Sequence, residues 1–257
     1  MLQVDGDMDA SAAPAINDRS GGGSGGSILL ISRNICSGTG RIDVRGGDAR
    51  AVNGGGGGGG RIAINCQTSR FRGQYRAFGG NGQKEAGGAG SVTVTVDNAR
   101  HRTLIFDNNG QHPGHAFIKN YTDLSREGGR SWIVTQYADR FNVERLLVRG
   151  GSHLGFKHIY DRTLTVVVNR LEGDLTGLLH ISSGNRLQIK STANLFPVSF
   201  RVYSGGYFTL PPTVLLKDLY YGNIFVEGVV NIASISIGRG TEIFIQETVC
   251  VNFFDFA

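Results

Sequence analysis

The chain has 257 residues, of which 40% are hydrophobic, so it is long enough to bury a sizeable core. Its 26 lysines and arginines exceed its 21 aspartates and glutamates, which gives a net charge of +5. These basic residues are scattered and are not interleaved with stacking aromatics, which argues against a nucleic-acid-binding face. No stretch is apolar enough to predict a membrane span, and three cysteines are too few for a disulfide-rich scaffold.

A glycine-rich unit occurs three times in the first hundred residues. Each copy has a short alternating strand, a double glycine, a glycine-laden loop and a second alternating strand. We take Gly6, Gly46 and Gly79 as equivalent, and the second strands begin at Ser27, Arg61 and Ser91. One such unit cannot bury its apolar face alone, whereas stacked units can, with strands paired in parallel. The repeat therefore predicts an all-β fold, a right-handed parallel β-helix or solenoid with glycine-rich loops.

Seven consecutive glycines at 54–60 have two alternative explanations. A run of glycine carries no core information and is typical of a flexible linker. The run nevertheless occupies the same place in its unit as 21–26 and 87–90, between strands that must lie side by side. We therefore prefer a loop that bulges from a coil or a packed polyglycine segment.

The second half of the chain repeats a different pattern around a glycine turn. Counted from Gly151, Gly184, Gly205 and Gly240, apolar residues recur at minus five, minus three, plus three and plus five. They are Leu146, Val148, Leu154 and Phe156; Leu179, Ile181, Leu187 and Ile189; Phe200, Val202, Phe208 and Leu210; and Ile235, Ile237, Ile243 and Ile245. Independent hairpins in a sandwich would give the same alternation. No Asn-Gly or Asp-Gly hairpin turn joins the paired strands, so continuing coils of about twenty residues are preferred.

These patterns divide the chain into three stretches within one continuous elongated domain. Residues 1–96 are glycine-rich coils, 97–142 a less regular junction with a few strands, and 143–257 aliphatic coils. Helix-length apolar periodicity is absent, and glycine interrupts most windows that could form a helix. The junction holds His112 and His115, which could contribute to a metal site, but a surface loop explains them more simply because further ligands are not evident.

Catalysis in a parallel β-helix needs carboxylates, or a carboxylate and a base, on adjacent coils. Asp43 lies on the outer face of its strand beside Arg76 of the next unit, with no second acid in the same row. Asp5, Asp7 and Asp9 form the only acidic cluster and could equally be a solvated edge. We therefore predict no catalytic residue, with a polysaccharide lyase or hydrolase as the alternative function.

The remaining candidate sites are few. Tyr203, Tyr207, Tyr220 and Tyr221 are the only aromatics we can offer as a carbohydrate contact, although packing at a strand edge explains them as well. A disulfide between Cys36 and Cys66 is compatible with their places in successive units but is not required, and Asn120 begins a single glycosylation sequon. The Gly-Gly-Asp and Gly-Gly-Asn steps are similar to calcium-binding solenoid repeats, but the full spelling does not occur, so no cofactor or metal is predicted.

Three segments carry a resemblance to a known class. They are Gly-Gly-Gly-Ser-Gly-Gly-Ser-Ile at 21–28, Gly-Thr-Gly-Arg-Ile-Asp-Val-Arg-Gly-Gly at 38–47 and Gly-Gly-Gly-Arg-Ile-Ala-Ile at 58–64. They resemble glycine-rich β-solenoid segments of very large secreted or surface-attached multidomain proteins. The resemblance implies an extracellular structural or adhesive role without catalytic residues.

Partners follow from the predicted fold, because the end of a solenoid is an unpaired strand edge. We expect neighbouring domains or subunits to associate through the exposed coil ends, and surface glycans to be further candidates. The chain opens within a repeat and ends in a predicted strand, so it is expected to be a piece of a longer extracellular or cell-surface protein.

Overall fold

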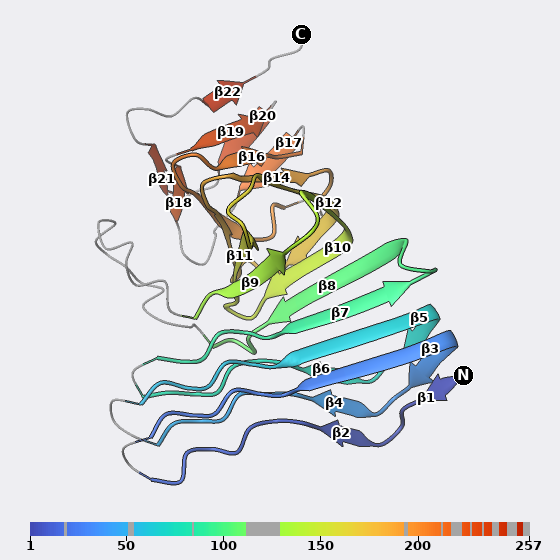
Figure 1. Ribbon diagram of the computed structural model, residues 1–257. Helices are drawn as coiled ribbons and strands as arrows, with labels where there is room; N and C mark the ends of the chain where they lie inside the picture. Colours follow the sequence, from blue (N-terminus) through green and yellow to red (C-terminus); the bar gives the residue numbers. More distant parts are fainter. Residues whose placement is uncertain are drawn as a thin grey trace. The chain divides into compact units, whose positions relative to one another are not determined.

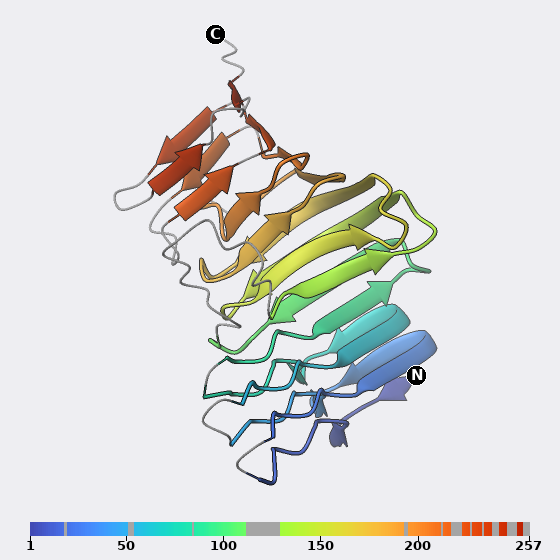
Figure 2. The same ribbon diagram turned by 60° about the vertical axis from the view of Figure 1, so that its left-hand side comes forward.

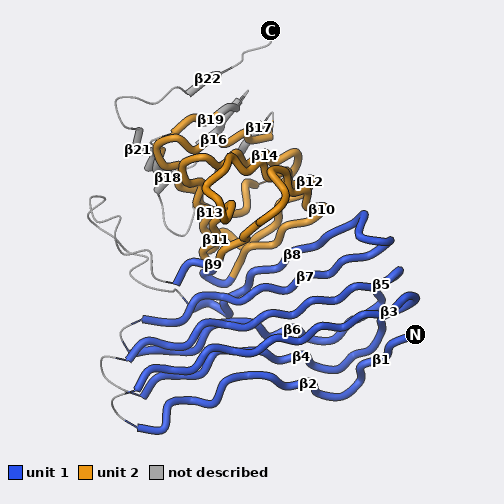
Figure 3. Tube along the Cα trace, in the orientation of Figure 1, with its two compact units in different colours: residues 1–131, 150–152 blue, residues 132–149, 153–257 orange. Residues whose placement is uncertain are grey.

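A computed structural model describes the backbone of residues 1–17, 20–50, 54–83, 85–111, 129–192, 195–211, 213–216, 223–226, 228–232, 234–237, 242–245 and 251–253. Beyond residue 211 the side chains are described only at 226 and 228–230. The described residues form strands and turns without a helix, and most strand pairs are parallel, so the all-β prediction is confirmed (Figure 1). The chain divides into two compact units, here unit 1 (1–131 and 150–152) and unit 2 (132–149 and 153–257) (Figure 3). The break at Ser131–Trp132 falls inside the stretch predicted as a junction.

Unit 1 contains eight described strands. In chain order they are β1 (Leu2–Gln3), β2 (Asp7–Asp9), β3 (Ser27–Gly38), β4 (Arg41–Asp43), β5 (Arg61–Phe71), β6 (Gln74–Arg76), β7 (Ser91–Val96) and β8 (His101–Asp107). One sheet has the order β1-β3-β5-β7-β8 within this unit, and a second has the order β2-β4-β6. Only the β7–β8 pair of these strands is antiparallel, after a tight turn in which Asp97, Asn98 and Ala99 have positive φ.

The three glycine-rich repeats stack in register, but the register of the first differs from the prediction. The second strands pair as predicted, with Ser27 beside Arg61 and Arg61 beside Ser91. The first strand of repeat one is β2, whose Asp7 pairs with Arg41, so Gly6 is equivalent to Gly40 and not to Gly46. The sequence assignment was wrong because repeat one carries Ala12 and Ala13 where the others have a double glycine, so Gly6 was taken as the equivalent glycine instead.

The glycine-rich segments between the strands are packed polyglycine, which rules out the linker alternative for the described 54–60. They form two layers, one of outgoing segments (10–15, 44–49 and 77–81) and one of returning segments (20–26, 54–60 and 85–90). Within the returning layer the N–H of Gly22 donates to Gly55 and that of Gly56 to Glu85. Between layers Gly57 donates to Gly47 and Gly60 to Val44. Contacts repeat every third residue, which is the period of a polyproline II helix.

This threefold period explains why glycine is needed at two positions of three in the segment 54–60. A Cβ on Gly57 would lie 1.9 Å from the Gly23 carbonyl oxygen, and one on Gly59 would lie 1.9 Å from that of Ala77. A Cβ on Gly58 would have nothing within 4 Å. We call this hydrogen-bonded structure the polyglycine array. In its middle repeat the backbones approach too closely for a side chain at Gly56, Gly57, Gly59 and Gly60.

A buried asparagine ends the polyglycine array above the third repeat. Gly46 donates its N–H to the Phe78 carbonyl of the next repeat, and the equivalent Gly79 donates to Oδ1 of Asn108 at 2.9 Å. Nδ2 of Asn108 donates to the carbonyl oxygens of Gly87 and Gln111 at 3.0 and 2.8 Å. The side-chain amide therefore takes the place that the backbone of another repeat would fill.

Unit 2 contains fourteen described strands. They are β9 (Ser131–Thr135), β10 (Arg140–Arg149), β11 (His153–His158), β12 (Leu164–Gly173), β13 (Leu178–Ile181), β14 (Asn185–Ile189), β15 (Ser199–Val202), β16 (Tyr207–Thr209), β17 (Thr213–Leu216), β18 (Asn223–Val226), β19 (Val229–Ile232), β20 (Ser234–Ile237), β21 (Glu242–Ile245) and β22 (Val251–Phe253). They form three parallel sheets, with the orders β10-β12-β14-β16-β19-β22, β21-β18-β15-β13-β11-β9 and β17-β20. Consecutive strands thus change sheet, and each pairs with a strand of the next circuit.

The predicted alternation in this half is confirmed where side chains are described. All twelve apolar positions around Gly151, Gly184 and Gly205 are at most 5% exposed. The three glycines have φ of 77°, 73° and 74°, the left-handed region that glycine enters without steric cost. The strands flanking Gly184, β13 and β14, belong to different sheets, so they are not a hairpin. Gly240 lies outside the described residues.

Two details of the repeat in unit 2 differ from the prediction. Gly184 and Gly205 occupy equivalent turns, whereas Gly151 lies at another corner, between β10 and β11. Gly228, which was not singled out, is the equivalent of Gly206 in the next circuit, because Tyr207 pairs with Val229 and Val229 donates to the Gly206 carbonyl. The sequence pattern could not distinguish the two kinds of turn, because apolar residues alternate in the same way around each of them. Arg186 pairs with Tyr207 and Tyr207 with Val229, which gives circuits of 21 and 22 residues, whereas Arg140 pairs with Thr165 in a circuit of 25. These lengths agree with the predicted coils of about twenty residues.

Candidate functional site

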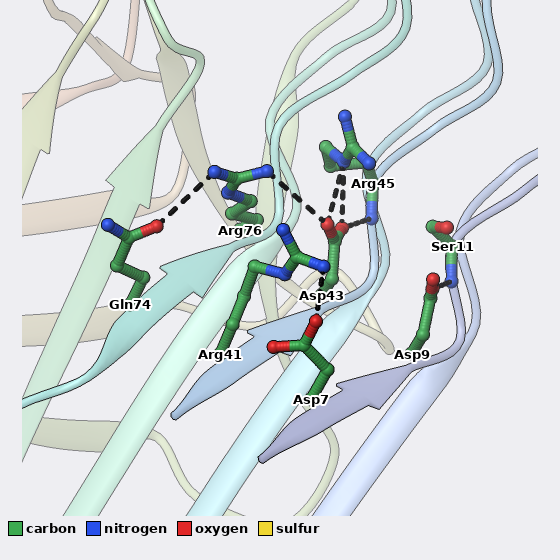
Figure 4. Close-up of polar contacts among 8 residues, drawn as sticks. All are labelled: Asp7, Asp9, Ser11, Arg41, Asp43, Arg45, Gln74 and Arg76. Carbon is green, nitrogen blue, oxygen red and sulfur yellow. Dashed lines mark hydrogen bonds and ion pairs between the residues drawn. The ribbon is translucent and has the colours of Figure 1, made fainter. Parts of the chain in front are cut away.

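Charged side chains form two rows across the three-stranded sheet of unit 1 (Figure 4). The strand register gives the rows Asp7–Arg41–Gln74 and Asp9–Asp43–Arg76, which we call the charged ladder. It brings together the carboxylates and arginines of adjacent repeats that a polysaccharide-active β-helix would need. It is therefore the first place to look for catalysis.

Asp43 is the centre of the charged ladder and is only 1% exposed. Nε of Arg45 donates to both carboxylate oxygens, at 2.8 and 2.9 Å, and the Arg45 backbone N–H adds a bond of 3.2 Å. Nη1 of Arg76 lies 3.9 Å away on the other side. Asp43 alternates with the core residues Ile42 and Val44, as expected for the outer face, but it is buried there and not solvated, because Arg45 and Arg76 cover it. The prediction of no second acid in its row was wrong, since the true register of repeat one places Asp9 there.

The other acids of the ladder are also engaged. Asp7 pairs with Nη2 of Arg41 at 2.5 Å. Hydrogen bonds from Ser11, whose backbone N–H lies 2.7 Å from Asp9 Oδ1, lower the pKa of Asp9 below its ordinary value. The pKa of the nearby Asp5 is lowered likewise, by Gln3 first and by the Thr39 N–H next. These bonds favour the ionised carboxylates.

The arrangement supports the register of the strands and not acid–base chemistry. A general acid must carry a proton near neutral pH, whereas lowered pKa values keep Asp5 and Asp9 ionised. Asp43 is buried and both its oxygens accept from Arg45, so this carboxylate is not exposed to a substrate. The hollow described in unit 1, of about 400 Å³, is lined by the polyglycine array with Glu85 and Arg130 and not by the ladder. The ladder is therefore an ion-pair network between repeats.

Cys36 and Cys66, for which the spacing left a bridge open, are joined in a disulfide. In the strand register Cys66 faces Ser32 and Cys36 faces Ser69, so the two cysteines are not opposite each other. Both strands bend in this region (Figure 2), and a bulge interrupts the register between Ser32 and Ile35. This geometry brings the two Cα atoms to 6.0 Å, and both residues are buried in the core of unit 1.

The described tyrosines do not form a row. Tyr203 follows β15 and its hydroxyl lies 3.0 Å from Nδ1 of the buried His180, with the two rings stacked at 6.0 Å. Tyr207 begins β16, which belongs to another sheet, and lies beneath the guanidinium of Arg186 at 5.8 Å. Tyr203 is thus a packing residue, whereas Tyr207 borders a hollow in unit 2.

Several predicted residues lie outside the described part of the chain. They are Tyr220, Tyr221, Asn120, His112 and His115. Within the described residues no group of three or more histidine, cysteine or acidic side chains is placed to hold a metal. In the same residues no helix has the length and apolar character of a membrane span.

Sequence reasoning did not single out Asn108, Arg186 or the Asp9–Asp43 pairing. Asn108 follows a strand in an Asp-Asn-Asn-Gly turn, and its burial depends on the repeat below it. The one available signal was the 34-residue step from Ser27 to Arg61, which applied to Asp9 would have placed it beside Asp43.

Comparison with known proteins gives no relative. No protein-family model, no curated protein and no solved structure matches the chain. Its function must be inferred from its own residues.

Proposed function

We propose that the chain is a non-catalytic structural or adhesive segment of an extracellular or cell-surface assembly, built as a right-handed parallel β-solenoid. The observation that carries the proposal is the hydrogen-bonded stacking of the three repeats through both sheets and the polyglycine array. The changes of sheet between consecutive strands of unit 2 support the same architecture. Backbone hydrogen bonds from each repeat to its neighbours are typical of repeat proteins, in which contacts between adjacent repeats supply much of the stability.

The disulfide supports the extracellular location. Disulfides form and persist in oxidising compartments such as the cell exterior. Cys36–Cys66 joins adjacent repeats, so it would hold the stack together where no reducing system or chaperone is at hand.

The first repeat supports the proposed association with a neighbouring domain or subunit. Bonds within each layer of the array run from an N–H of one repeat to a carbonyl of the next, as from Ala12 to Arg45 and from Gly25 to Gly58. The equivalent carbonyls of repeat one, those of Ser11 and Ser24, accept no backbone bond from any described residue. This edge therefore presents backbone carbonyls that can accept hydrogen bonds, and the carboxylates of Asp5, Asp7 and Asp9 lie in the same repeat. Its complement is another repeat that brings N–H donors and basic side chains.

Two measurements on the full chain test the proposal. Sedimentation velocity over a concentration series should show association that weakens with salt, because the edge is acidic. A monomer at every concentration and at low salt would contradict association through this edge. The competing function, a polysaccharide lyase or hydrolase, predicts release of reducing ends or unsaturated products from acidic and neutral polysaccharides. We expect none, and reproducible product release abolished by Asp43→Asn would replace the structural proposal with the enzymatic one.

A further inference from the structure

A hollow of about 370 Å³ opens on unit 2 at the turns that precede β14, β16 and β19. Its walls are mostly backbone, and its only charged side chain is that of Arg186. The lining residues are Thr163, Gly184, Arg186, Ser204, Gly205, Gly206, Tyr207, Gly228 and Val229. The glycine turns stack because Gly184 donates to the Gly205 carbonyl and Val229 donates to that of Gly206. The hollow is thus built by the repeat itself.

Arg186 is held in place without being neutralised. It is the strand partner of Tyr207, and its guanidinium carbon lies 5.8 Å from the centre of the Tyr207 ring, a cation–π arrangement. In the part of the chain that the structure describes, Arg186 makes no ion pair. A planar guanidinium fixed over an aromatic ring loses less conformational freedom when it binds a ligand and is suited to bidentate contact with an oxoanion.

The surroundings of the hollow are also basic. Arg140 begins β10 and Arg162 precedes β12, so both lie at the same end of the parallel strands as Arg186. Nε of Arg140 donates to Asn142, Arg162 lies over the Tyr160 ring, and neither makes an ion pair with a described residue. The acids nearby in sequence face other groups, since Asp139 contacts His158 at 3.4 Å and Asp161 contacts Lys157 at 4.0 Å.

We propose that this hollow binds the oxoanion group, a carboxylate or a sulfate, of an acidic glycan. Arg186 binds the anion, and the hydroxyl groups of Thr163 and Ser204 with the turn backbone serve the sugar hydroxyls. Arg140 and Arg162 provide positive potential for further charges along the glycan. An acidic glycan would be a ligand for the adhesive role proposed above. The inference rests on that role only for where the protein would meet such a glycan. All lining residues of the hollow belong to unit 2.

An acidic peptide is the competing occupant, and the geometry disfavours it. Peptides commonly bind by adding a strand to a sheet edge or by placing apolar side chains in pockets. β14 and β16 are both paired on both sides, so the hollow borders no free strand edge. Its lining offers Val229 as the one aliphatic side chain larger than a methyl group. Polar walls with one aromatic and one guanidinium suit a sugar acid better.

The experiment is a calorimetric titration of the full chain with four probes. They are trigalacturonate as the carboxylate, a sulfated heparin hexasaccharide, neutral cellotriose, and a hexaglutamate peptide. Arg186→Gln removes the guanidinium from an exposed position, so the fold should be unaffected. Arg61→Gln is the matched control, because Arg61 is also an exposed arginine at the start of a parallel strand, but in unit 1.

We expect one of the acidic oligosaccharides to bind, and whichever binds identifies the carboxylate or the sulfate as the recognised group. Arg186→Gln should weaken that binding about tenfold or more, and Arg186→Lys should recover only part of it, whereas Arg61→Gln should leave it unchanged. Binding of cellotriose or hexaglutamate with equal affinity would overturn the proposal, as would equal losses in the Arg186 and Arg61 variants or no binding of either acidic glycan. Any of these failures would leave the structural role untouched, because sedimentation and repeat stacking do not depend on Arg186.

Discussion

At the scale of single residues, the most distinctive feature of this protein is glycine, which lets neighbouring backbones pack closely. In the returning segment of the middle repeat, Gly56, Gly57, Gly59 and Gly60 face another backbone at a distance that excludes a Cβ, whereas a Cβ on Gly58 would meet nothing. Glycine is therefore required here by close approach and not by positive φ, since none of Gly57 to Gly60 has a positive φ. Neighbouring glycines in one run should consequently differ sharply in their tolerance of substitution.

Gly57→Ala should destabilise the protein by about 3 kcal/mol, since the new Cβ would meet backbone atoms that cannot move aside alone. Gly58→Ala is the matched control, because its Cβ would meet nothing within 4 Å. It should be neutral or stabilising by up to about 1 kcal/mol, since alanine restricts the unfolded chain. Urea unfolding of the two variants gives the comparison. Equal effects of the two substitutions would contradict the packed array.

At the scale of elements, the last segment of a parallel stack has backbone groups that need hydrogen-bond partners from outside the stack. Asn108 meets this need with its side chain, since it supplies the acceptor that Phe78 supplies one repeat earlier. Its amide oxygen accepts from the Gly79 N–H, and its amide nitrogen donates to the carbonyls of Gly87 and Gln111. A polar side chain buried at 0% exposure is tolerated here because it is hydrogen-bonded in full.

Asn108→Ala should cost about 3 kcal/mol, because three hydrogen bonds of roughly 1 kcal/mol each are lost and buried backbone groups remain unpaired. Asn65→Ala, at an exposed position of β5 in the same unit, should change the unfolding free energy by less than about 0.5 kcal/mol. Hydrogen exchange followed residue by residue should show the Gly79 amide losing protection in the Asn108 variant alone. A Gly79 amide equally protected in both variants would show that Asn108 does not act as the cap.

Sequence reasoning at this scale succeeded for strands and failed for register. The alternation of apolar and polar residues located the core positions around Gly184 and Gly205. It could do so because successive side chains of a strand point to opposite faces, so burial of one face recurs at every second residue. The equivalence of Gly6 with Gly40, the burial of Asp43 and the role of Asn108 depend on which residue of another repeat lies alongside. Spacing alone leaves that choice open when glycine is abundant.

At the scale of the whole chain, the two units differ in their means of stabilisation. Unit 1 combines an apolar core with close backbone packing, the charged ladder and one disulfide. Unit 2 relies on an apolar interior, in which Phe196, Phe200 and Phe208 meet edge to face. Conditions that reduce disulfides should therefore act on unit 1 selectively.

Reduction of Cys36–Cys66 should destabilise unit 1 by about 3.5 kcal/mol, the loop-closure entropy expected for a separation of 30 residues. The double variant with Cys36→Ser and Cys66→Ser should match the reduced protein, and adding reductant to it should have no further effect. Hydrogen exchange should show faster exchange in β3 and β5 and unchanged exchange in β12 and β14. Equal loss of protection in both pairs of strands would contradict the assignment of the bridge to unit 1.

The sequence by itself determined that this protein is built of repeated strands, where the turns fall and which aliphatic side chains are buried, because these properties follow from local periodicity and from glycine. The tertiary structure alone decided the register between repeats. That register pairs Asp9 with Asp43, buries Asp43 under two arginines and places Arg186 over Tyr207 beside a hollow. The physical reason is that stacking adds contacts between residues about 20 to 34 positions apart, and the energy of those contacts depends on the exact offset, which the local pattern does not encode.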